Sequence, residues 1–453
     1  MNIQTINPAT EEVIGNYEAA KESEIKYAVE KSRTAFAGWR ANGISERTAL
    51  LTRLSKILSK NREKYAGLIT KEMGKPIKES LSEVEKCSLL CDYYAENAEK
   101  FLEDETVETE ARRSYVAFEP LGVVACIMPW NFPFWQVMRF AVPAMTAGNT
   151  IVLKHSSICP GSALEICDAM EESGFPKDVF QTVIGSAPVG EALIKSDVNA
   201  VSVTGSLGTG KIVAKLAVDG MKKFVLELGG DDPLIILEDA DIEEACRGAV
   251  RGRIVNSGQS CIAAKRFIVV EGVAQEFTDM LVEETAGLKI GDPTSMKTDV
   301  GPLVREAARR KLGEQIDDSV KAGAEILLGG RNTIGKGYFY QPTVMGKVTG
   351  KMRVASEETF GPVAPIMVAR DEEDAIRIAN DSELGLGASV WTRDLERGER
   401  VARRLEAGVV CVNGTVHSDP RMPFGGVKKS GVGRELSHYG LKEFVNVKSV
   451  KIM

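Results

Sequence analysis

Residues 122–154 read GVVACIMPWNFPFWQVMRFAVPAMTAGNTIVLK, and this stretch decides the fold class. GVVACIM (122–128) and TIVLK (150–154) are short apolar runs of the kind that forms buried strands. QVMRFAVPAMTAG (136–148), which lies between them, has the length and composition of a helix. A strand, a helix and a second strand in succession form the unit from which parallel sheets are built.

The same alternation continues along the chain. Helices are expected at 161–174, 187–196 and 208–220, and strands at 180–185, 200–205 and 223–230. This pattern predicts an α/β fold in which helices cover both faces of a parallel sheet. Ligands of such folds bind at the carboxyl ends of the strands, so the loop after residue 204 lies where a site is expected.

The segments on either side of this region have different textures. Residues 21–105 are rich in Glu and Lys and predict long amphipathic helices. A second α/β region starts near residue 231, with strands at 233–239 and 266–272 and helices at 241–253 and 273–287. The segments 112–120 and 443–453 predict strands outside both cores, suited to pairing or to subunit contact.

Composition limits the functional classes. The chain has 453 residues, enough for two or three domains, and 43% of them are hydrophobic. A net charge of −7 argues against a surface for nucleic acid or anionic membrane. The longest apolar stretch, 121–153, is interrupted by prolines and polar residues, and the N-terminus has no apolar export signal. We therefore expect a cytoplasmic protein that binds neither nucleic acid nor membrane.

The cysteines and histidines indicate the kind of chemistry. Eight cysteines are spread widely and predict free thiols in a reducing compartment. Cys87 and Cys91 share a helix face, but no second pair completes a metal site, so none is expected. The three histidines stand in no catalytic arrangement. A catalytic base is therefore expected to be another residue type.

TGSLGTGK (204–211) resembles the phosphate-binding loop of ATPases. The match fails at Ile212, where that loop carries the Ser or Thr that holds magnesium. LIILED (234–239) offers acids for a magnesium ion, so a P-loop nucleotidase is one alternative function. That alternative gives no role to PWNFP, LELGG or NSGQSC, so these motifs call for a second hypothesis about the function.

Three residues in those motifs have suitable chemistry. Cys261 closes NSGQSC among small residues, so a substrate can approach its sulfur. Glu227 lies between leucines, where an apolar environment raises the pKa of a carboxyl toward that of a general base. Asn131 is fixed between prolines, and its amide can donate to an oxyanion. Each has a structural alternative, as a core cysteine, a strand glutamate and a turn residue.

These pieces, in this order, resemble the aldehyde dehydrogenase superfamily. The resemblance runs from NPATEEVIG at Asn7 to the C-terminus and includes PWNFP, TGS, LELGG, GQSC, EETFGPV and PFGG. It implies a Rossmann-type dinucleotide-binding domain (1–106 and 124–230), an α/β catalytic domain (231–415) and a small β bridging element (107–123 and 440–453). It also implies a homodimer or a homotetramer.

The resemblance implies a mechanism for oxidising an aldehyde to a carboxylic acid. The Cys261 thiolate attacks the aldehyde carbonyl, and the oxyanion is held by the Asn131 amide and the Cys261 backbone N–H. Hydride leaves for a nicotinamide and gives a thioester, which is hydrolysed by a water that Glu227 activates. A catalytically silent scaffold of the same fold is the alternative if the thiol is unreactive.

The cofactor residues follow from the same resemblance. Positions that match the family's cofactor contacts are Trp130, Gly205, Ser206, Glu358 and Phe360. KHSS (154–157) stands where relatives carry Lys-Pro-Ser-Glu, and Ser157 removes the glutamate that repels a 2′-phosphate. With Lys154 nearby, and His155 as a second candidate, this predicts NADP as the cofactor, with NAD as the alternative.

The substrate is expected to carry an acid group. Trp135 and Arg139 lie one helical turn apart, and an inward arginine needs an anion, either a substrate carboxylate or a buried acid. This helix, KHSS and HSDPRMPFGGVKKSG (417–431) resemble the succinate-semialdehyde dehydrogenase branch, which implies that Arg139, Ser260 and Ser418 bind the distal carboxylate. Glutarate semialdehyde, lactaldehyde and glyceraldehyde remain alternative substrates.

Overall fold

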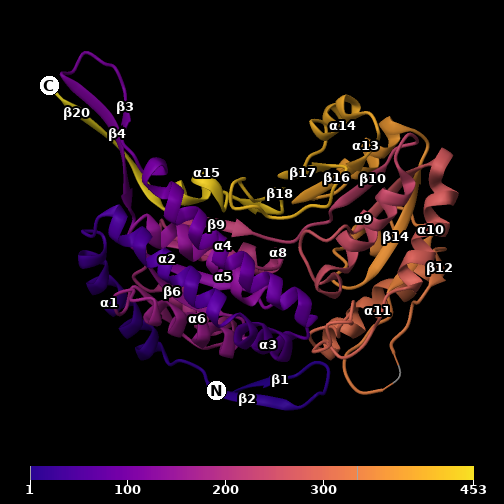
Figure 1. Ribbon diagram of the computed structural model, residues 1–453, viewed down its shortest axis with the longest axis horizontal. Helices are drawn as coiled ribbons and strands as arrows, with labels where there is room; N and C mark the ends of the chain where they lie inside the picture. Colours follow the sequence, from indigo (N-terminus) through magenta and orange to yellow (C-terminus); the bar gives the residue numbers. More distant parts are fainter. Residues whose placement is uncertain (1, 334) are drawn as a thin grey trace.

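The computed structural model describes residues 2–333 and 335–453. Figure 1 shows two α/β bodies side by side, with an arm of strands projecting from the first and carrying the C-terminus. The two bodies are built on two largely parallel sheets, one of six strands and one of seven. The predicted α/β fold with parallel sheets is therefore confirmed.

The six-stranded sheet has the order β19-β9-β8-β5-β6-β7. Its five parallel strands are β5 (Val123–Met128), β6 (Thr150–His155), β7 (Phe180–Thr182), β8 (Ala200–Thr204) and β9 (Lys223–Glu227). The sixth, β19 (Gly431–Val432), comes from the far end of the chain and pairs antiparallel with β9. Every strand predicted for 122–230 is present. The inner strands are largely apolar, as central strands of a covered parallel sheet are, whereas β7 is a three-residue strand at the edge.

Helices cover both faces of this sheet, as Figure 1 shows. One face is packed by α2 (Ile44–Lys60), α3 (Arg62–Met73), α4 (Ile77–Phe101), α5 (Pro133–Thr146) and α6 (Pro160–Glu172). The other face is packed by α1 (Glu22–Trp39), α7 (Ala187–Lys195) and α8 (Leu207–Asp219). The hydrophobic stripes of these helices bury the sheet on both sides, so its strands are apolar on both faces.

The strand order places a ligand site at one point of this sheet. β5 lies between β6 and β8, so the chain winds outward in both directions from β5. The carboxyl ends of β5 and β8 therefore open a crevice, which is where ligands of open parallel sheets bind. The loops that leave these two strands carry Trp130 and Asn131 on one side and Gly205 and Ser206 on the other.

The seven-stranded sheet has the order β12-β13-β14-β11-β10-β16-β17. Its strands are β10 (Pro233–Ile236), β11 (Arg266–Val270), β12 (Glu325–Leu328), β13 (Thr343–Gly346), β14 (Val363–Ala369), β16 (Gly387–Trp391) and β17 (Val409–Val412). Only the edge strand β12 pairs antiparallel. The two strands predicted at 233–239 and 266–272 are β10 and β11, which lie side by side in its centre.

Two clusters of buried apolar side chains hold helices against this sheet. The helices of this body are α9 (Ile242–Ile254), α10 (Ala274–Ala286), α11 (Glu306–Lys321), α12 (Arg353–Ser356), α13 (Glu372–Asn380) and α14 (Leu395–Ala402). Two short 3-10 turns, at Val255–Gly258 and Glu271–Val273, join helices to the neighbouring segments. The turn at 255–258 ends directly before the Cys261 loop and so fixes where that loop begins.

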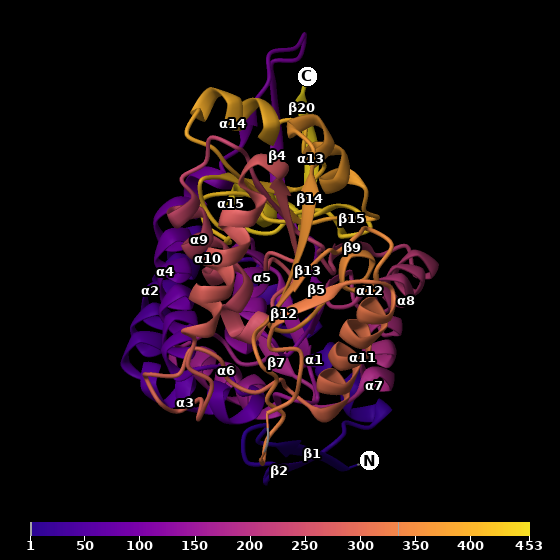
Figure 2. The ribbon, with the colours of Figure 1, turned by 90° about the vertical axis from the view of Figure 1, so that its right-hand side faces the viewer.

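Smaller elements connect these bodies. The arm is an antiparallel sheet of β3 (Glu105–Thr106), β4 (Arg113–Pro120) and β20 (Val445–Ile452). Figure 2 shows β1 (Asn2–Ile6) and β2 (Val13–Glu18) as a hairpin at the opposite end of the molecule. After β17 the chain crosses back to the first sheet through β18 (Val427–Lys428), which pairs with β15 (Leu384–Gly385), and then through β19 and α15 (Ser437–Lys442). Across the described part of the chain, no helix is long and apolar enough to span a membrane.

Candidate active site

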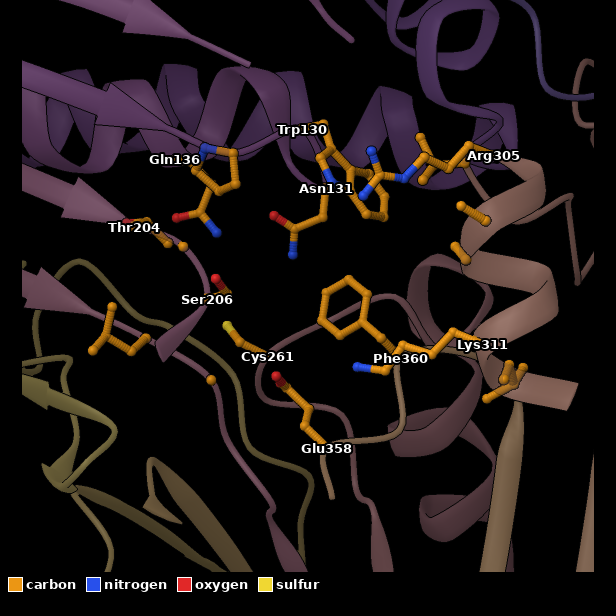
Figure 3. A pocket seen from close by; sticks show the side chains of 18 of the residues that line it. Trp130, Asn131, Gln136, Thr204, Ser206, Cys261, Arg305, Lys311, Glu358 and Phe360 are labelled. Atoms are coloured by element: carbon orange, nitrogen blue, oxygen red, sulfur yellow. The ribbon is translucent and has the colours of Figure 1, made fainter. Parts of the chain in front are cut away.

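A cavity of about 460 Å³ lies at the carboxyl ends of β5 and β8, between the two bodies. Figure 3 shows it from close by, with Cys261 and Glu358 on one side and Trp130 and Asn131 on the other. Seven predicted site residues line it, namely Trp130, Asn131, Gly205, Ser206, Cys261, Glu358 and Phe360. Segments more than two hundred residues apart in the chain thus meet at one place.

Cys261 lies in a loop that two buried cations hold in place. Lys265 Nζ donates to the Cys261 carbonyl at 2.5 Å. Arg253 donates through Nη1 to the Ala264 carbonyl and through Nη2 to the Gly258 carbonyl, each at 2.8 Å. Burial raises the pKa of the Cys261 thiol to about 12, while the charges of Arg139 and Lys265 act in the opposite direction. The thiol of the free protein is therefore protonated at neutral pH and needs a base to become a nucleophile.

The backbone before Cys261 follows an unusual path. Asn256 and Ser257 have φ values of 53° and 55°, in the left-handed region, and Gly258 follows with φ at 77°. A Cβ at Gly258 would collide with the carbonyl of Gly361, so only glycine fits there. Strain of this kind persists where the surrounding contacts fix it, and here it presents the Cys261 thiol to the cavity.

Asn131 is buried, with its amide oriented by the Cys261 loop. Its Nδ2 donates one hydrogen to the Gln259 carbonyl at 3.2 Å, and Asn256 Nδ2 donates to the Asn131 carbonyl at 2.8 Å. The second Nδ2 hydrogen is left over, and Figure 3 shows the Asn131 amide projecting into the cavity that Cys261 enters. The Cys261 backbone N–H makes no hydrogen bond within residues 2–333 and 335–453. The two donors can together bind an oxyanion.

Glu227 ends β9, where it pairs across the sheet with Thr204 of the cavity wall. Its side chain is buried and does not line the cavity, although the next residue, Leu228, does. Neither carboxyl oxygen has a hydrogen-bond partner within the described part of the chain. Burial and the neighbouring Glu435 carboxyl raise the pKa of Glu227 well above its usual range. This is the environment that the sequence predicted for a general base.

Glu358 and Phe360 approach the cavity from the second body. Glu358 Oε1 accepts a hydrogen bond from the Gly230 backbone N–H at 3.2 Å and lies 3.6 Å from Lys265 Nζ. The Phe360 ring stands edge-on to the Trp130 ring, with their centroids 5.7 Å apart. The two rings form an apolar part of the cavity wall, and Figure 3 shows the Glu358 carboxylate pointing toward Cys261.

Lys154 and Ser157 lie at the end of β6 and do not line the cavity around Cys261. Burial lowers the pKa of Lys154 to about 8, since no acid pairs with it in the described residues. His155 is not the second cation that the sequence offered. Its Nδ1 accepts from the Ser156 N–H at 2.7 Å and its Nε2–H donates to the Pro133 carbonyl, so burial, which lowers its pKa to about 4, keeps it neutral.

A second cavity, of about 290 Å³, opens on the other side of Cys261. It shares Cys261 and Gln136 with the first cavity. All four predicted substrate residues line it, namely Trp135, Arg139, Ser260 and Ser418. The Ser260 hydroxyl is buried and has no hydrogen-bond partner within residues 2–333 and 335–453. The thiol therefore stands where a molecule in one cavity can meet a molecule in the other.

Arg139 already has an anionic partner in the protein. Its Nε forms an ion pair with Glu435 Oε2, and both side chains are only 2% exposed. Its Nη2 donates to Thr204 Oγ1 at 3.4 Å, and the guanidinium lies 4.6 Å from the centroid of the Phe424 ring. Of the two partners considered for this arginine, the structure supplies the buried acid, although the guanidinium also borders the cavity.

The family model described as "Aldehyde dehydrogenase family" matches residues 1–450, nearly the whole chain. The chain belongs to this family. The resemblance that the motifs indicated is therefore confirmed, and so is the aldehyde dehydrogenase-like fold.

Several relatives of the aldehyde dehydrogenase are close. The succinate semialdehyde dehydrogenase Sad of Escherichia coli, whose name specifies NAD(P)+, is 44% identical over 98% of this chain and 97% of its own. The succinate-semialdehyde dehydrogenase of Mycobacterium avium, named for NADP(+), is 43% identical over 100% of this chain and 97% of its own. A crystal structure of the succinic semialdehyde dehydrogenase of Streptococcus pyogenes with NADP+ superposes with a TM-score of 0.97, at 36% identity, over 99% of both chains.

The phosphate-loop alternative has no support in this aldehyde dehydrogenase. TGSLGTGK does join a strand, β8, to a helix, α8. However, Lys211 is exposed on α8 and does not line the cavity beside Gly205 and Ser206. The match to the ATPase pattern therefore does not extend to the position of its lysine.

Sequence reasoning missed four residues that shape the site. They are Lys86, Gln136, Lys265 and Glu435. Lys86 had a detectable pattern, since Glu79, Ser82, Glu83 and Lys86 have the i, i+3, i+4, i+7 spacing of one helix face. These four residues of α4 all line the second cavity. A polar stripe on one side of α4 was thus the sequence pattern that marked the site.

Proposed function

We propose that the protein oxidises succinate semialdehyde to succinate with NADP. The observation that carries this proposal is the position of Cys261 at the meeting point of two cavities. One cavity has the features of a dinucleotide site at the carboxyl ends of parallel strands, and the other has hydroxyls and cations at its walls. The names of the relatives from Escherichia coli and Mycobacterium avium support the same substrate and cofactor.

In this proposal Cys261, Asn131 and Glu227 are the catalytic residues. The Cys261 thiol first loses its proton to water, and the thiolate sulfur attacks the aldehyde carbon. The oxyanion of the thiohemiacetal receives hydrogen bonds from Asn131 Nδ2 and the Cys261 N–H. Glu227, whose raised pKa suits a general base, takes a proton from the water that hydrolyses the thioester. The acid product then leaves and the thiol is regenerated.

The residues around the larger cavity fit a dinucleotide. Ser206 caps α8 by accepting from the Thr209 N–H, and the N–H groups of the first turn are placed for a pyrophosphate near Gly205. The Trp130 and Phe360 rings give an apolar surface for a planar ring, and Glu358 offers a carboxylate to ribose hydroxyls. Lys154 is buried without an acid beside it, and an anionic group of the dinucleotide would give its ammonium group a partner. Bound NADP would supply the hydride acceptor.

The choice of NADP depends on Ser157. Replacing Ser157 by Glu is expected to raise the KM for NADP about tenfold or more, equivalent to about 1.4 kcal/mol, because a carboxylate would repel the 2′-phosphate. The same carboxylate can accept hydrogen bonds from the ribose of NAD, so the KM for NAD should hold or fall. Initial rates with each cofactor measure both effects, and Ser45→Glu, on the exposed surface of α2, is the matched control. An unchanged KM for NADP would place residue 157 outside the ribose pocket.

The smaller cavity is proposed to receive the carboxylate end of the substrate. Ser260 and Ser418 offer hydroxyls, Arg139 offers the N–H groups that Glu435 leaves free, and Trp135 forms an apolar wall. An aldehyde panel with NADP and NAD tests the proposal. Succinate semialdehyde with NADP should give the highest kcat/KM, above glutarate semialdehyde, lactaldehyde, glyceraldehyde and butanal. A higher kcat/KM for any of these aldehydes would make that aldehyde the proposed substrate. Magnesium-dependent ATP turnover would support the alternative function as a P-loop nucleotidase.

We also propose a function for each domain of the chain. Residues 1–106 and 124–230 would bind the dinucleotide, residues 231–415 would carry the nucleophile, and 107–123 with 440–453 would contact another subunit. The projecting arm supports the last assignment, since Val447 and Ile452 on β20 are 60% and 44% exposed. A homodimer or homotetramer in the cytoplasm is the assembly proposed, and the mass of the purified protein in solution tests it.

A further inference from the structure

The charges around the smaller cavity do not cancel. Two ion pairs at its wall are internally neutral: Arg139 with Glu435, and Glu83 with the buried Lys75. Glu83 also accepts hydrogen bonds from the Phe134 and Trp135 backbone N–H groups at the start of α5, so its charge is fully used. The charged groups that remain on this wall are Glu79, which accepts a hydrogen bond from the Asn256 backbone N–H at 2.6 Å, and the cations Lys86 and Arg251, so cations are in excess. Arg251 is exposed, which leaves Lys86 as the inner cation.

Lys86 is held in the cavity by contacts that leave its charge unneutralised. Its Nζ donates to Ser418 Oγ at 2.7 Å and lies 4.2 Å from the centroid of the Trp135 ring. Within residues 2–333 and 335–453, no carboxylate oxygen forms an ion pair with it. A hydroxyl and an aromatic face orient an ammonium group, but neither removes its charge. Two of its three N–H hydrogens are therefore free to meet an anion.

We propose that Lys86 is the residue that selects for a carboxylate on the substrate, by pairing with it through Nζ inside the smaller cavity. The inference rests on the proposed function, in which the aldehyde end of the substrate meets Cys261. It assigns the charge to Lys86 and gives Arg139, already neutralised by Glu435, a hydrogen-bonding role. Ser418, which also lines the cavity, accepts a hydrogen bond from Lys86 Nζ and so holds the ammonium group at the cavity wall.

The pH dependence of Lys86 follows from its surroundings. The charged and titratable groups that face it are Glu79, Glu83 and Cys87 on α4, Arg139 on α5, Arg251 on α9, and His417 and Asp419 in the loop after β17. Asp419 is paired with Arg421, and His417 Nδ1–H donates to the Thr415 carbonyl. Burial lowers the pKa of Lys86 to about 8, and the charge of Arg139 acts in the same direction. The ammonium form is present below that pH and is lost above it, so carboxylate binding weakens as the pH rises through about 8.

The test compares Lys86→Met, Lys86→Arg and the wild type on succinate semialdehyde and on butanal, which has the same chain length without the acid. Lys86→Met should lower kcat/KM for the semialdehyde about 30-fold, mostly through KM, and change butanal oxidation less than about threefold. Lys86→Arg should restore most of the loss because it keeps the charge. Lys100→Met, an exposed lysine on the same helix, is the matched control and should behave like the wild type.

Two further readouts separate a binding role from a structural one. Succinate, added as an inhibitor, should bind Lys86→Met about 30-fold more weakly, which does not depend on turnover. In the wild type, kcat/KM for the semialdehyde should fall relative to butanal above pH about 8, and Lys86→Met should lose this difference. Lys86→Arg should keep the preference at high pH, because a guanidinium stays charged.

The outcomes distinguish this inference from the function on which it rests. Equal loss on both aldehydes in Lys86→Met, with no rescue by Lys86→Arg, would show that Lys86 is structural and would overturn the inference. A semialdehyde preference that survives in Lys86→Met overturns only the role of Lys86. A wild-type enzyme that oxidises butanal as well as succinate semialdehyde would overturn the proposed substrate and the role of Lys86 together.

Discussion

Replacing Cys261 by alanine is expected to lower kcat for aldehyde oxidation by about 10⁴-fold or more. Cys261 lines both cavities, and a methyl group in place of its thiol cannot form the covalent bond to the aldehyde carbon. The affinity for NADP should change by less than about twofold, because the proposed cofactor contacts of Gly205, Ser206 and Glu358 do not depend on the thiol. Stopped-flow detection of reduced cofactor and fluorescence titration measure the two quantities.

A second cysteine gives the control for this experiment. Cys167 is half-buried on α6, and its thiol points to the Phe180 carbonyl, far along the chain from the catalytic loop. Cys167→Ala should keep wild-type turnover, and so should lose no reactivity toward aldehyde. Appreciable turnover by purified Cys261→Ala would contradict the assignment of Cys261 as the nucleophile. Cys167→Ala removes the same sulfur atom away from the site, so it shows whether a Cys-to-Ala change alone affects turnover. Equal losses in both variants would indicate damage to the fold.

The sheets were predictable because their signals are local. The strands at β5 and β6 are unbroken apolar runs, and such runs are buried on both faces wherever a parallel sheet is covered by helices. Their order in the sheet is not local, since β7 and β8 follow one another in the chain but lie on opposite sides of β5 and β6. The return of β19 to the first sheet was not predictable in this way, because a two-residue strand carries no periodic pattern.

The site residues also differ in whether their signal in the sequence is local. Cys261 and Asn131 were identified because their residue types suit the chemistry and their neighbours are unusual for a surface loop. Lys86 was missed because its partner Ser418 lies 332 residues away in the chain, and the polar stripe on its helix does not show which residues face it. Glu435 was missed for the same reason, and with it the ion pair that neutralises Arg139. A charge can be read from sequence, but its partner is a property of the fold.

His155 shows that the charge state of a residue cannot be predicted from the sequence alone. A histidine next to Lys154 suggested a second cation for a 2′-phosphate. In the fold, the Pro133 carbonyl accepts from Nε2–H and the Ser156 N–H donates to Nδ1. These two contacts fix the neutral tautomer and use both ring nitrogens. Whether a histidine carries charge is decided by such contacts, which sequence spacing cannot supply.

Glu227→Gln is expected to slow the hydrolysis of the thioester by about 10²-fold to 10³-fold while leaving its formation much less affected. Burial and the Glu435 carboxyl raise the pKa of Glu227, so its proton affinity suits the removal of a proton from water. A glutamine of the same shape keeps the packing but cannot accept that proton. Rapid mixing with succinate semialdehyde and NADP should show a burst of reduced cofactor, about one per active site, followed by slow turnover.

The pH profile gives the sign of the effect and its control. Because the pKa of Glu227 is raised, its base form is scarce at low pH and grows as the pH rises, so kcat of the wild type should increase through that range. Glu227→Gln should lose this rising limb, whereas Glu243→Gln, on the exposed face of α9, should keep it. If the burst and the slow phase of Glu227→Gln fall by the same factor, Glu227 acts before the thioester forms. Its role would then be the deprotonation of the Cys261 thiol, whose raised pKa demands a base.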